Sequence, residues 1–317
     1  MKKKFLITTY HEAFAIKGGG EYELFYLVDT MRECGLVADV YGPYSRDIDN
    51  YDIIIHFSVH ESGLELLKFI KSKNKKIILW PNLWFNKSNE ISKNVVKNFI
   101  DIVDFIVFKS DAEFNKFSEI LQVPLNKCIK YNLIADKYYT IESSKNLFNQ
   151  LYGIKDYALW MGIIEPSKNQ LAAIEPLKKK NIPLVFVGKY RDEQYYNLCK
   201  RIGGQNVFFI DYIARKSEIA RSAFQNALFY IELSLEPAGI SSIEAGLSGC
   251  RVILSDTAWS YEHFANHAVY VDPNSASSIE NGIDKVLNQP KKNIELQKSL
   301  LKYCEPNSIL ELIKLTK

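Results

Sequence analysis

LFYIELSLEPAGISSIEAGLSGCRVILSD, residues 228–256, is the stretch of this chain that decides its fold. It begins with a nearly unbroken apolar run over 228–233, which is typical of a strand covered on both faces in a parallel sheet. A proline and a glycine follow, then a short helical segment to about Gly249 and a second apolar strand. This succession predicts a parallel α/β sheet with a helix N-terminus at the sheet edge where ligands bind.

Two carboxylates lie on either side of the turn in this stretch. Glu236 directly follows the first strand, and Glu244 lies within the helix, seven residues intervening. Between them Gly239 lets backbone approach a ligand closely, and we expect Ser241 to cap the helix. Ser241 and Glu244 also form the pattern of a capping box, so one alternative for Glu244 is a purely structural role. For Glu236 the alternative is a solvated loop acid.

Composition and charge limit the classes of protein that fit. With 317 residues, 47% of them hydrophobic, the chain can build two domains of ordinary size. Forty basic and 37 acidic residues leave a net charge of +3, which argues against a nucleic-acid-binding protein. The five cysteines are scattered and indicate reduced thiols. Since the first apolar run is too short for a signal peptide and none reaches about eighteen residues, we expect a cytoplasmic protein.

Strand-like and helix-like segments alternate along the whole chain. Strands are predicted in the first half at 5–9, 37–41, 53–57, 77–80 and 105–108, and in the second at 158–161, 183–187, 207–210, 228–233, 252–254 and 268–271. A joint lies near 141–152. We therefore predict an α/β protein with two Rossmann-like, doubly wound domains over 1–150 and 151–317, and the last helix is a candidate to pack back on the first domain.

A second candidate site is MGIIEPSKNQ, residues 161–170, where a strand ends, turns and enters a helix. We expect Ser167 to cap this helix and to form a capping box with Gln170. Lys168 would then be the first helical residue, where its charge opposes the helix dipole and a bound anion would remove the conflict. The alternative is a lysine that points into water.

These two stretches together resemble the donor site of the family 4 retaining glycosyltransferases. The resemblance is carried by the E-x7-E spacing of Glu236 and Glu244 and by Lys168, six residues after the strand-end Gly162. It extends over most of the second half of the chain. It implies the GT-B architecture, in which two Rossmann-like domains face a central cleft, and a nucleotide-diphosphate sugar as co-substrate with no other cofactor and no metal.

The resemblance also implies roles for residues. Lys168 would grip the donor diphosphate, Glu236 would hold hydroxyls of the transferred sugar, and Glu244 would bind the ribose. The nucleobase would lie against Asp211, Tyr212 and Ile213, and the turn of Ala238, Gly239, Ile240 and Ser241 would offer N–H groups to phosphate and sugar. No protein nucleophile is implied, because the leaving diphosphate accepts the proton of the incoming hydroxyl, so positioning and electrostatic stabilisation supply most of the catalysis.

The chain departs from the family at two positions. The family usually has an arginine directly after the strand-end glycine, where this chain has Ile163. Lys189, Arg191 and Arg215 are candidates to replace it, and Lys189 ranks first because it directly follows a strand end. The family often has an active-site histidine after the strand at 77–80. Here Asn82 lies in that region and would orient the donor or the acceptor instead.

The first half supplies a glycine-rich loop made of Gly18, Gly19 and Gly20, which in the family lies against the donor diphosphate. A flexible loop needs the same residues, and the motif is neither GxGxxG nor a P-loop. His11, beside this loop, is the best site candidate among the histidines that follow strand ends, although a packed or surface histidine is commoner. Asp47 and Asp49 resemble a DxD metal site superficially, and we expect no metal there.

Five lysines precede three aromatic residues and form a candidate surface for peripheral membrane contact at the inner face of the membrane: Lys68, Lys71, Lys73, Lys75, Lys76, Trp80, Trp84 and Phe85. The favoured alternative is a solvated helix end.

Taken with the resemblance, these patterns predict a retaining, metal-independent glycosyltransferase that moves a sugar to a saccharide or lipid-linked acceptor in bacterial surface polysaccharide or glycolipid synthesis. Two alternatives stay open. One is a nucleotide-sugar epimerase of related architecture. The other is a non-catalytic pseudo-transferase subunit that binds a sugar nucleotide, which Ile163 and the missing histidine motivate.

Overall fold

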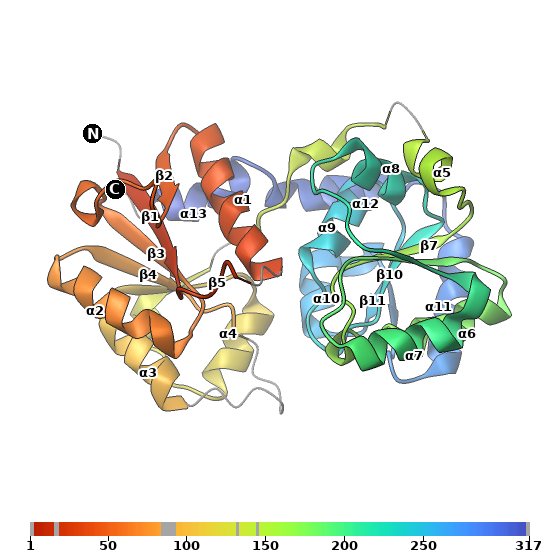
Figure 1. Cartoon of the computed structure of the whole chain (residues 1–317), viewed down its shortest axis with the longest axis horizontal. Coiled ribbons are helices and arrows are strands. Elements are labelled where there is room, and N and C mark those ends of the chain that lie inside the picture. The colour runs from red at the N-terminus through yellow and green to blue at the C-terminus, as the bar shows by residue number, and fades with distance from the viewer. Residues whose placement is uncertain (1–2, 16–18, 84–92, 131–132, 144–145, 315–317) are drawn as a thin grey trace. The chain divides into compact units, whose positions relative to one another are not determined.

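A computed structural model describes residues 3–15, 19–83, 93–130, 133–143 and 146–314. The chain forms two compact units, the first made of Met1–Ile134 with Glu305–Lys317 and the second of Ala135–Cys304 (Figure 1). The sequence-based division at residue 150 lies later than this, because the segment before it is tied to the second unit. There Tyr139 packs on Phe224 at 5.7 Å between ring centroids, and the amide of Ser143 donates to Gln225.

The first unit is a six-stranded parallel sheet with strand order β2-β1-β3-β4-β5-β6. Its strands are β1 (Lys4–Thr9), β2 (Val37–Val40), β3 (Ile53–Phe57), β4 (Lys76–Trp80), β5 (Phe105–Phe108) and β6 (Cys128–Lys130). Its helices are α1 (Gly19–Glu33), α2 (Leu64–Ser72), α3 (Lys93–Ile102), α4 (Asp111–Ser118) and α13 (Leu310–Lys314). The chain winds outward in both directions from β1 and β3.

Both faces of this sheet are covered, which explains why its strands read as continuous apolar runs. Phe5 and Ile7 belong to one buried cluster, together with Leu24 of α1 and Leu312 of α13. Leu6, between them, belongs to a second cluster with residues of α2 and α3. The last helix, drawn in blue in Figure 1, is therefore part of the core of the first unit.

The second unit is also a six-stranded parallel sheet, with strand order β12-β11-β10-β7-β8-β9. Its strands are β7 (Ala158–Met161), β8 (Leu184–Val187), β9 (Val207–Ile210), β10 (Phe229–Glu232), β11 (Val252–Ser255) and β12 (Val269–Val271). Its helices are α5 (Leu147–Tyr152), α6 (Leu171–Lys179), α7 (Glu193–Gly203), α8 (Glu218–Asn226), α9 (Ile240–Leu247), α10 (Ala258–Phe264), α11 (Ala276–Leu287) and α12 (Ile294–Leu300).

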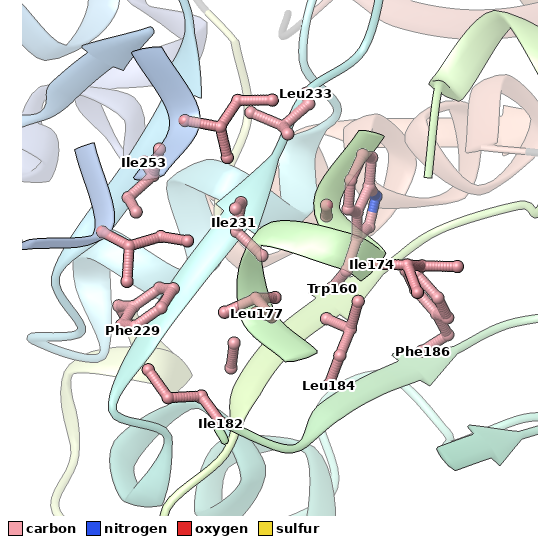
Figure 2. Close-up of a cluster of buried hydrophobic side chains, with 14 of the residues drawn as sticks. Trp160, Ile174, Leu177, Ile182, Leu184, Phe186, Phe229, Ile231, Leu233 and Ile253 are labelled. Atoms are coloured by element: carbon pink, nitrogen blue, oxygen red, sulfur yellow. The ribbon is translucent and has the colours of Figure 1, made fainter. Parts of the chain in front are cut away.

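The core of the second unit fills the space between the sheet and its helices. Figure 2 shows Trp160 of β7 and Ile231 of β10 together with Ile174 and Leu177 of α6. All four side chains are almost completely buried. Because β7 pairs with β10 as well as with β8, the two directions of winding meet at β7 and β10. In open α/β sheets such a reversal leaves a crevice at the carboxyl ends of the strands, where ligands bind.

The two predicted helix caps are wrong. Helix α9 begins at Ile240 with Gly239 as its N-cap, so Glu244 lies too far into the helix for a capping box with Ser241. Ser167 and Lys168 lie in a 3-10 turn, Pro166–Lys168, and Asn169 ends this turn with a left-handed φ of 57°. Helix α6 starts only at Leu171, so Lys168 is not its first residue and does not oppose its dipole.

Over the described ranges, no helix has the length and apolarity that crossing a bilayer requires.

Candidate active site

The loops that follow β7 and β10 are joined at the point where the strand order reverses. The amide of Leu235 donates to the carbonyl of Ser167 at 3.0 Å. The side chain of Asn169 donates to the carbonyl of Leu233 at 3.3 Å and to that of Pro273 at 3.1 Å. The left-handed backbone of Asn169, which ends the 3-10 turn, is a conformation that asparagine tolerates. The two loops therefore form one rim over the carboxyl end of the sheet.

Lys168 and Glu236, the two predicted catalytic residues, contact each other on this rim. Lys168 Nζ lies 3.2 Å from Glu236 Oε2, and the two side chains are 23% and 26% exposed. Both side chains are partly exposed, so water screens this ion pair more than it would a fully buried one. Both groups are therefore placed to exchange their partner for a ligand.

Glu244 is buried and ion-paired. Its Oε1 lies 2.7 Å from Nη2 of Arg215, with side-chain exposures of 4% and 22%. Arg215 follows β9, so the pair ties the loop after β9 to α9. Of the other two candidates to replace the arginine absent at Ile163, Arg191 pairs with Glu165 at 2.8 Å. The third, Lys189, is exposed, and its carbonyl accepts from the amide of Ile164 at 2.9 Å.

A pocket of about 540 Å³ lies at the carboxyl ends of β8 and β9. It is lined by Gly188, Lys189, Tyr190, Tyr196, Phe209, Ile210 and Asp211. The rings of Tyr190 and Tyr196 stack, with centroids 4.5 Å apart. Of the predicted nucleobase residues, Asp211 lines this pocket, while Tyr212 and Ile213 follow it in the chain outside the lining.

Gly188 brings this pocket against the β7 loop. Its φ is +146°, and a Cβ there would lie 2.1 Å from the carbonyl oxygen of Gly162. Only glycine allows the ends of β7 and β8 to approach this closely.

The start of α9 lies at the same edge of the sheet. The N-cap Gly239 does not offer its amide to a ligand, because that amide donates to Glu232 Oε1 at 2.9 Å. Ala238 precedes the cap, and Ile240 and Ser241 begin the helix, where amides have no acceptor within the helix itself. Glu232 is a functional candidate that sequence reasoning missed. The available signal was a carboxylate at the end of an otherwise apolar strand.

In the first unit, Gly19 and Gly20 are the first residues of α1. A Cβ on Gly20 would lie 2.8 Å from Phe57 Cζ and 2.9 Å from Asn82 Nδ2. Glycine therefore permits the helix start to lie against Asn82. Gly18 falls outside the described residues.

Asn82 is held by Lys109, a second residue that sequence reasoning missed. Lys109 Nζ lies 3.3 Å from Asn82 Oδ1 and 2.9 Å from Glu23 Oε2. Burial by itself would lower the pKa of Lys109, but the carboxylates of Glu23 and Glu113 outweigh it and raise the pKa. The lysine therefore stays charged and fixes the amide of Asn82.

His11 lies on the loop after β1. Its Nε2 is 3.0 Å from Glu12 Oε1, and its side chain is 72% exposed. The neighbouring Tyr10 stacks on His60, which follows β3, with ring centroids 4.6 Å apart. His11 also borders a pocket of about 360 Å³, lined by Ile7, Thr9, Tyr10, His11, Phe14, Val40, Tyr41, Gly42, Ser62 and Leu66.

The lysines near the end of α2 are engaged with acidic groups and carbonyls. Lys71 pairs with Asp104 at 2.8 Å and Lys73 with Asp49 at 3.2 Å, while Lys75 donates to the carbonyl of Asp49. These contacts support the solvated helix end. Trp84 and Phe85 fall outside the described residues. Among the residues described, no group of three or more histidine, cysteine or acidic side chains could hold a metal ion.

Comparison with known proteins identifies the second unit. Residues 148–303 match the family model described as "Glycosyl transferases group 1", and this range contains Lys168, Glu236 and Glu244. The second unit belongs to this family, and the chain is a glycosyltransferase. Comparison with curated protein sequences gives no match.

Solved structures show that the whole chain has the GT-B fold. Alr3699/HepE from Anabaena, solved in complex with UDP and glucose, has a TM-score of 0.78 at 13% identity, with 99% of each chain covered. Sucrose-phosphate synthase from Thermosynechococcus elongatus has a TM-score of 0.76 at 13% identity, covering 99% of this chain and 97% of that one. A glycosyltransferase from Rickettsia africae ESF-5 has a TM-score of 0.76 at 15% identity, covering 100% and 98%. The predicted fold class is confirmed.

Proposed function

We propose that this glycosyltransferase moves a sugar from a nucleotide-diphosphate sugar to a saccharide or lipid-linked acceptor, with retention of the anomeric configuration and without a metal ion. The observation that carries the proposal is the contact between Lys168 and Glu236 at the strand-order reversal, beside the start of α9. A cation, a carboxylate and the first amides of a helix come together there. The cation and the amides suit the phosphates of a phosphorylated sugar, and the carboxylate suits its hydroxyls.

The donor would occupy the edge of the second sheet from α9 to the pocket after β9. Its diphosphate accepts hydrogen bonds from the amides of Ile240 and Ser241 and from Lys168. To bind the diphosphate, Lys168 gives up its contact with Glu236. Glu236 then accepts hydrogen bonds from the transferred sugar. Glu244 binds the ribose while Arg215 balances its charge. The nucleobase enters the pocket that contains Asp211 and the two stacked tyrosines.

Positioning of the reacting groups and electrostatic stabilisation would supply most of the catalysis. The charge of Lys168 and the dipole of α9 stabilise the leaving diphosphate as the glycosidic bond breaks. The diphosphate oxygen takes the proton of the acceptor hydroxyl as that hydroxyl attacks from the same face. Retention follows from this front-face displacement, which the family resemblance supports, and no side chain forms a covalent bond to the sugar.

The acceptor would bind the first unit. The pocket beside His11 combines aromatic rings with polar groups, a composition suited to a saccharide. Asn82, fixed by Lys109, would orient the donor or the acceptor from the same sheet. A role in bacterial surface polysaccharide or glycolipid assembly, and peripheral contact at the inner face of the membrane, rest on the family resemblance.

A two-step experiment tests the proposal. A thermal-shift screen of UDP-, GDP-, ADP-, TDP- and CMP-linked sugars should identify one donor class that raises the melting temperature. The enzyme is then incubated with that donor and a panel of saccharide and lipid-linked acceptors, and NMR of the product gives its anomeric configuration. Transfer with retention is expected, whereas an inverted product would contradict the proposal.

One observation favours a second candidate, a non-catalytic pseudo-transferase that binds a sugar nucleotide. Ile163 stands where the family usually has an arginine, and Arg191 is paired with Glu165. Donor binding without transfer across the whole acceptor panel would support this candidate. Isomerisation of the donor sugar without an acceptor would instead indicate the epimerase.

A further inference from the structure

Glu232 is a buried carboxylate beneath the candidate site, and the proposed reaction gives it no role. It is the last residue of β10, one of the two strands where the winding direction changes, and the residue is 3% exposed. A carboxylate in such a position destabilises the fold unless hydrogen bonds replace its lost hydration. Its partners therefore indicate why a carboxylate occupies this place.

Three groups surround the carboxylate. Oε1 accepts from the amide of Gly239 at 2.9 Å and from the hydroxyl of Ser234 at 3.1 Å. Oε2 lies 2.7 Å from the hydroxyl of Tyr230, which is also 3.3 Å from the carbonyl of Met161. Burial and the neighbouring Glu232 raise the pKa of Tyr230 well above its ordinary value, so its hydroxyl keeps its proton and donates it.

These contacts connect both loops of the site from below. Met161 ends β7 immediately before the loop that carries Lys168. Gly239 is the N-cap of α9 and ends the loop that carries Glu236. The buried carboxylate thus holds the loop before α9 through Gly239, and the tyrosine that donates to it lies against the end of β7.

At the start of α9, Glu232 performs the task of a capping-box glutamate. In a capping box, a glutamate inside the helix accepts the N–H of the N-cap residue. Glycine at the N-cap has no side chain of its own for capping. Glu232 instead accepts the Gly239 amide from the strand below. The direction of the next two amides, those of Ile240 and Ser241, depends on this anchor.

We propose that Glu232 is a positioning residue for the donor diphosphate, which aims the amides of Ile240 and Ser241 by holding Gly239. This inference rests on the proposed function of the site. The property that matters is a hydrogen-bond acceptor at the position of Oε1, since a displacement of about 1 Å is enough to misalign a bound group.

The experiment compares binding of a nucleoside diphosphate with binding of the corresponding nucleoside, using the base found in the thermal-shift screen. Glu232→Ala and Glu232→Asp should weaken the diphosphate about tenfold or more, because both remove the acceptor from its place. Binding of the nucleoside should change less than about twofold. Glu232→Gln should stay within about threefold of the unmodified protein for both ligands, since its amide oxygen still accepts from Gly239.

Ser234→Ala is the matched control, because it removes a second hydrogen bond to the same oxygen and leaves the Gly239 contact in place. It should behave like Glu232→Gln. Glu232→Asp keeps a buried carboxylate and serves if the alanine variant does not fold. Equal losses for nucleoside and diphosphate would overturn the inference in favour of a general packing role. A glutamine variant as poor as the aspartate variant would also overturn it. If the unmodified protein binds no nucleoside diphosphate, the proposed function fails instead.

Discussion

At the scale of single residues, the two predicted carboxylates of the candidate site already have cationic partners. Glu236 contacts Lys168 at the accessible rim, whereas Glu244 contacts Arg215 at a buried position. The first pair can open at small cost, because water screens it. The second pair is harder to break, since removal of one partner leaves the charge of the other buried, with little water to solvate it. A ligand that binds at Glu244 should therefore leave its ion pair with Arg215 in place and add contacts to it. A ligand that binds at Lys168 should replace its ion pair with Glu236.

Replacement of Glu244 by alanine should weaken nucleotide binding. A ribose hydroxyl pair would lose a charged acceptor, at a cost of about 1.5–3 kcal/mol of binding free energy. Calorimetric titration with the nucleotide selected by the screen measures this loss. Circular dichroism confirms that the variant is folded. If a folded variant binds with unchanged affinity, Glu244 serves only as the structural partner of Arg215.

Replacement of Lys168 by alanine should weaken diphosphate donors far more than the free nucleoside. The lysine is assigned to phosphate, so a loss of about 1.5–3 kcal/mol is expected for the donor alone. Lys179→Ala provides a matched control, because Lys179 is an exposed lysine paired with Glu280 in the same unit. Equal losses for donor and nucleoside in the Lys168 variant would remove this residue from the diphosphate site.

At the scale of elements, the site is built from strand ends that approach each other closely. Gly188 lets the end of β8 lie against the turn after β7, and Gly20 lets the start of α1 lie against Asn82. Glu232 anchors the start of α9 from β10. The loops are therefore shaped by contacts with neighbouring strands more than by their own residues.

Gly188→Ala should destabilise the protein more than Gly204→Ala. Both glycines have positive φ in conformations that residues with a Cβ rarely adopt, so both variants carry backbone strain of about 1–3 kcal/mol. A Cβ at Gly188 would also collide with the carbonyl of Gly162, whereas at Gly204 nothing lies within 4 Å. The overpacking should add about 1–3 kcal/mol. Chemical denaturation of the two variants measures the difference. Equal destabilisation would show that the two strand ends separate easily.

At the scale of the whole molecule, each of the two units is a doubly wound sheet with its own strand-order reversal. The second unit contains the predicted donor residues, and its family match covers this region. The first unit contains His11, Gly20 and Asn82 at the carboxyl ends of its own strands. In the proposed function, the second unit holds the donor and the first unit recognises the acceptor.

The complete enzyme should transfer sugar in the presence of EDTA, and Glu236→Ala should reduce turnover more than donor affinity. In the proposed function, Lys168 and the start of α9 would supply the positive potential that the leaving diphosphate needs. A carboxylate that aligns the sugar hydroxyls acts as the bond breaks, so misplacement can lower the rate on the order of 10²-fold. Steady-state kinetics with and without EDTA measure both effects. A rate lost in EDTA and restored by a divalent cation would contradict metal independence.

Sequence reasoning recovered every strand except β6, along with the residues at the strand ends, because apolar runs and turn residues are local signals. Strand β6 was missed because its three residues, Cys128–Lys130, form no apolar run. The same reasoning placed Lys168, Glu236 and Glu244 at a sheet edge, and it failed on the caps of α6 and α9. The pattern Ser-x-x-Glu cannot show that Gly239, two residues before Ser241, is already the N-cap of the helix. Lys109 was missed because its partners, Glu23 and Asn82, are distant in the chain. Glu232 was missed because its contact with Gly239 depends on how the turn after β10 folds back over the strand end.

The amino-acid sequence by itself determined the alternation of strands and helices, the parallel sheets and the polar residues at the strand ends. These follow from residue spacing, which sets the faces that are buried. Only the tertiary structure decided that Lys168 meets Glu236, that Arg215 meets Glu244 and that Glu232 holds Gly239. The strand order places β7 beside β10, which brings Lys168 to Glu236, and the path of the loop after β9 brings Arg215 to Glu244. Which charges pair is a property of that packing, and no local pattern contains it.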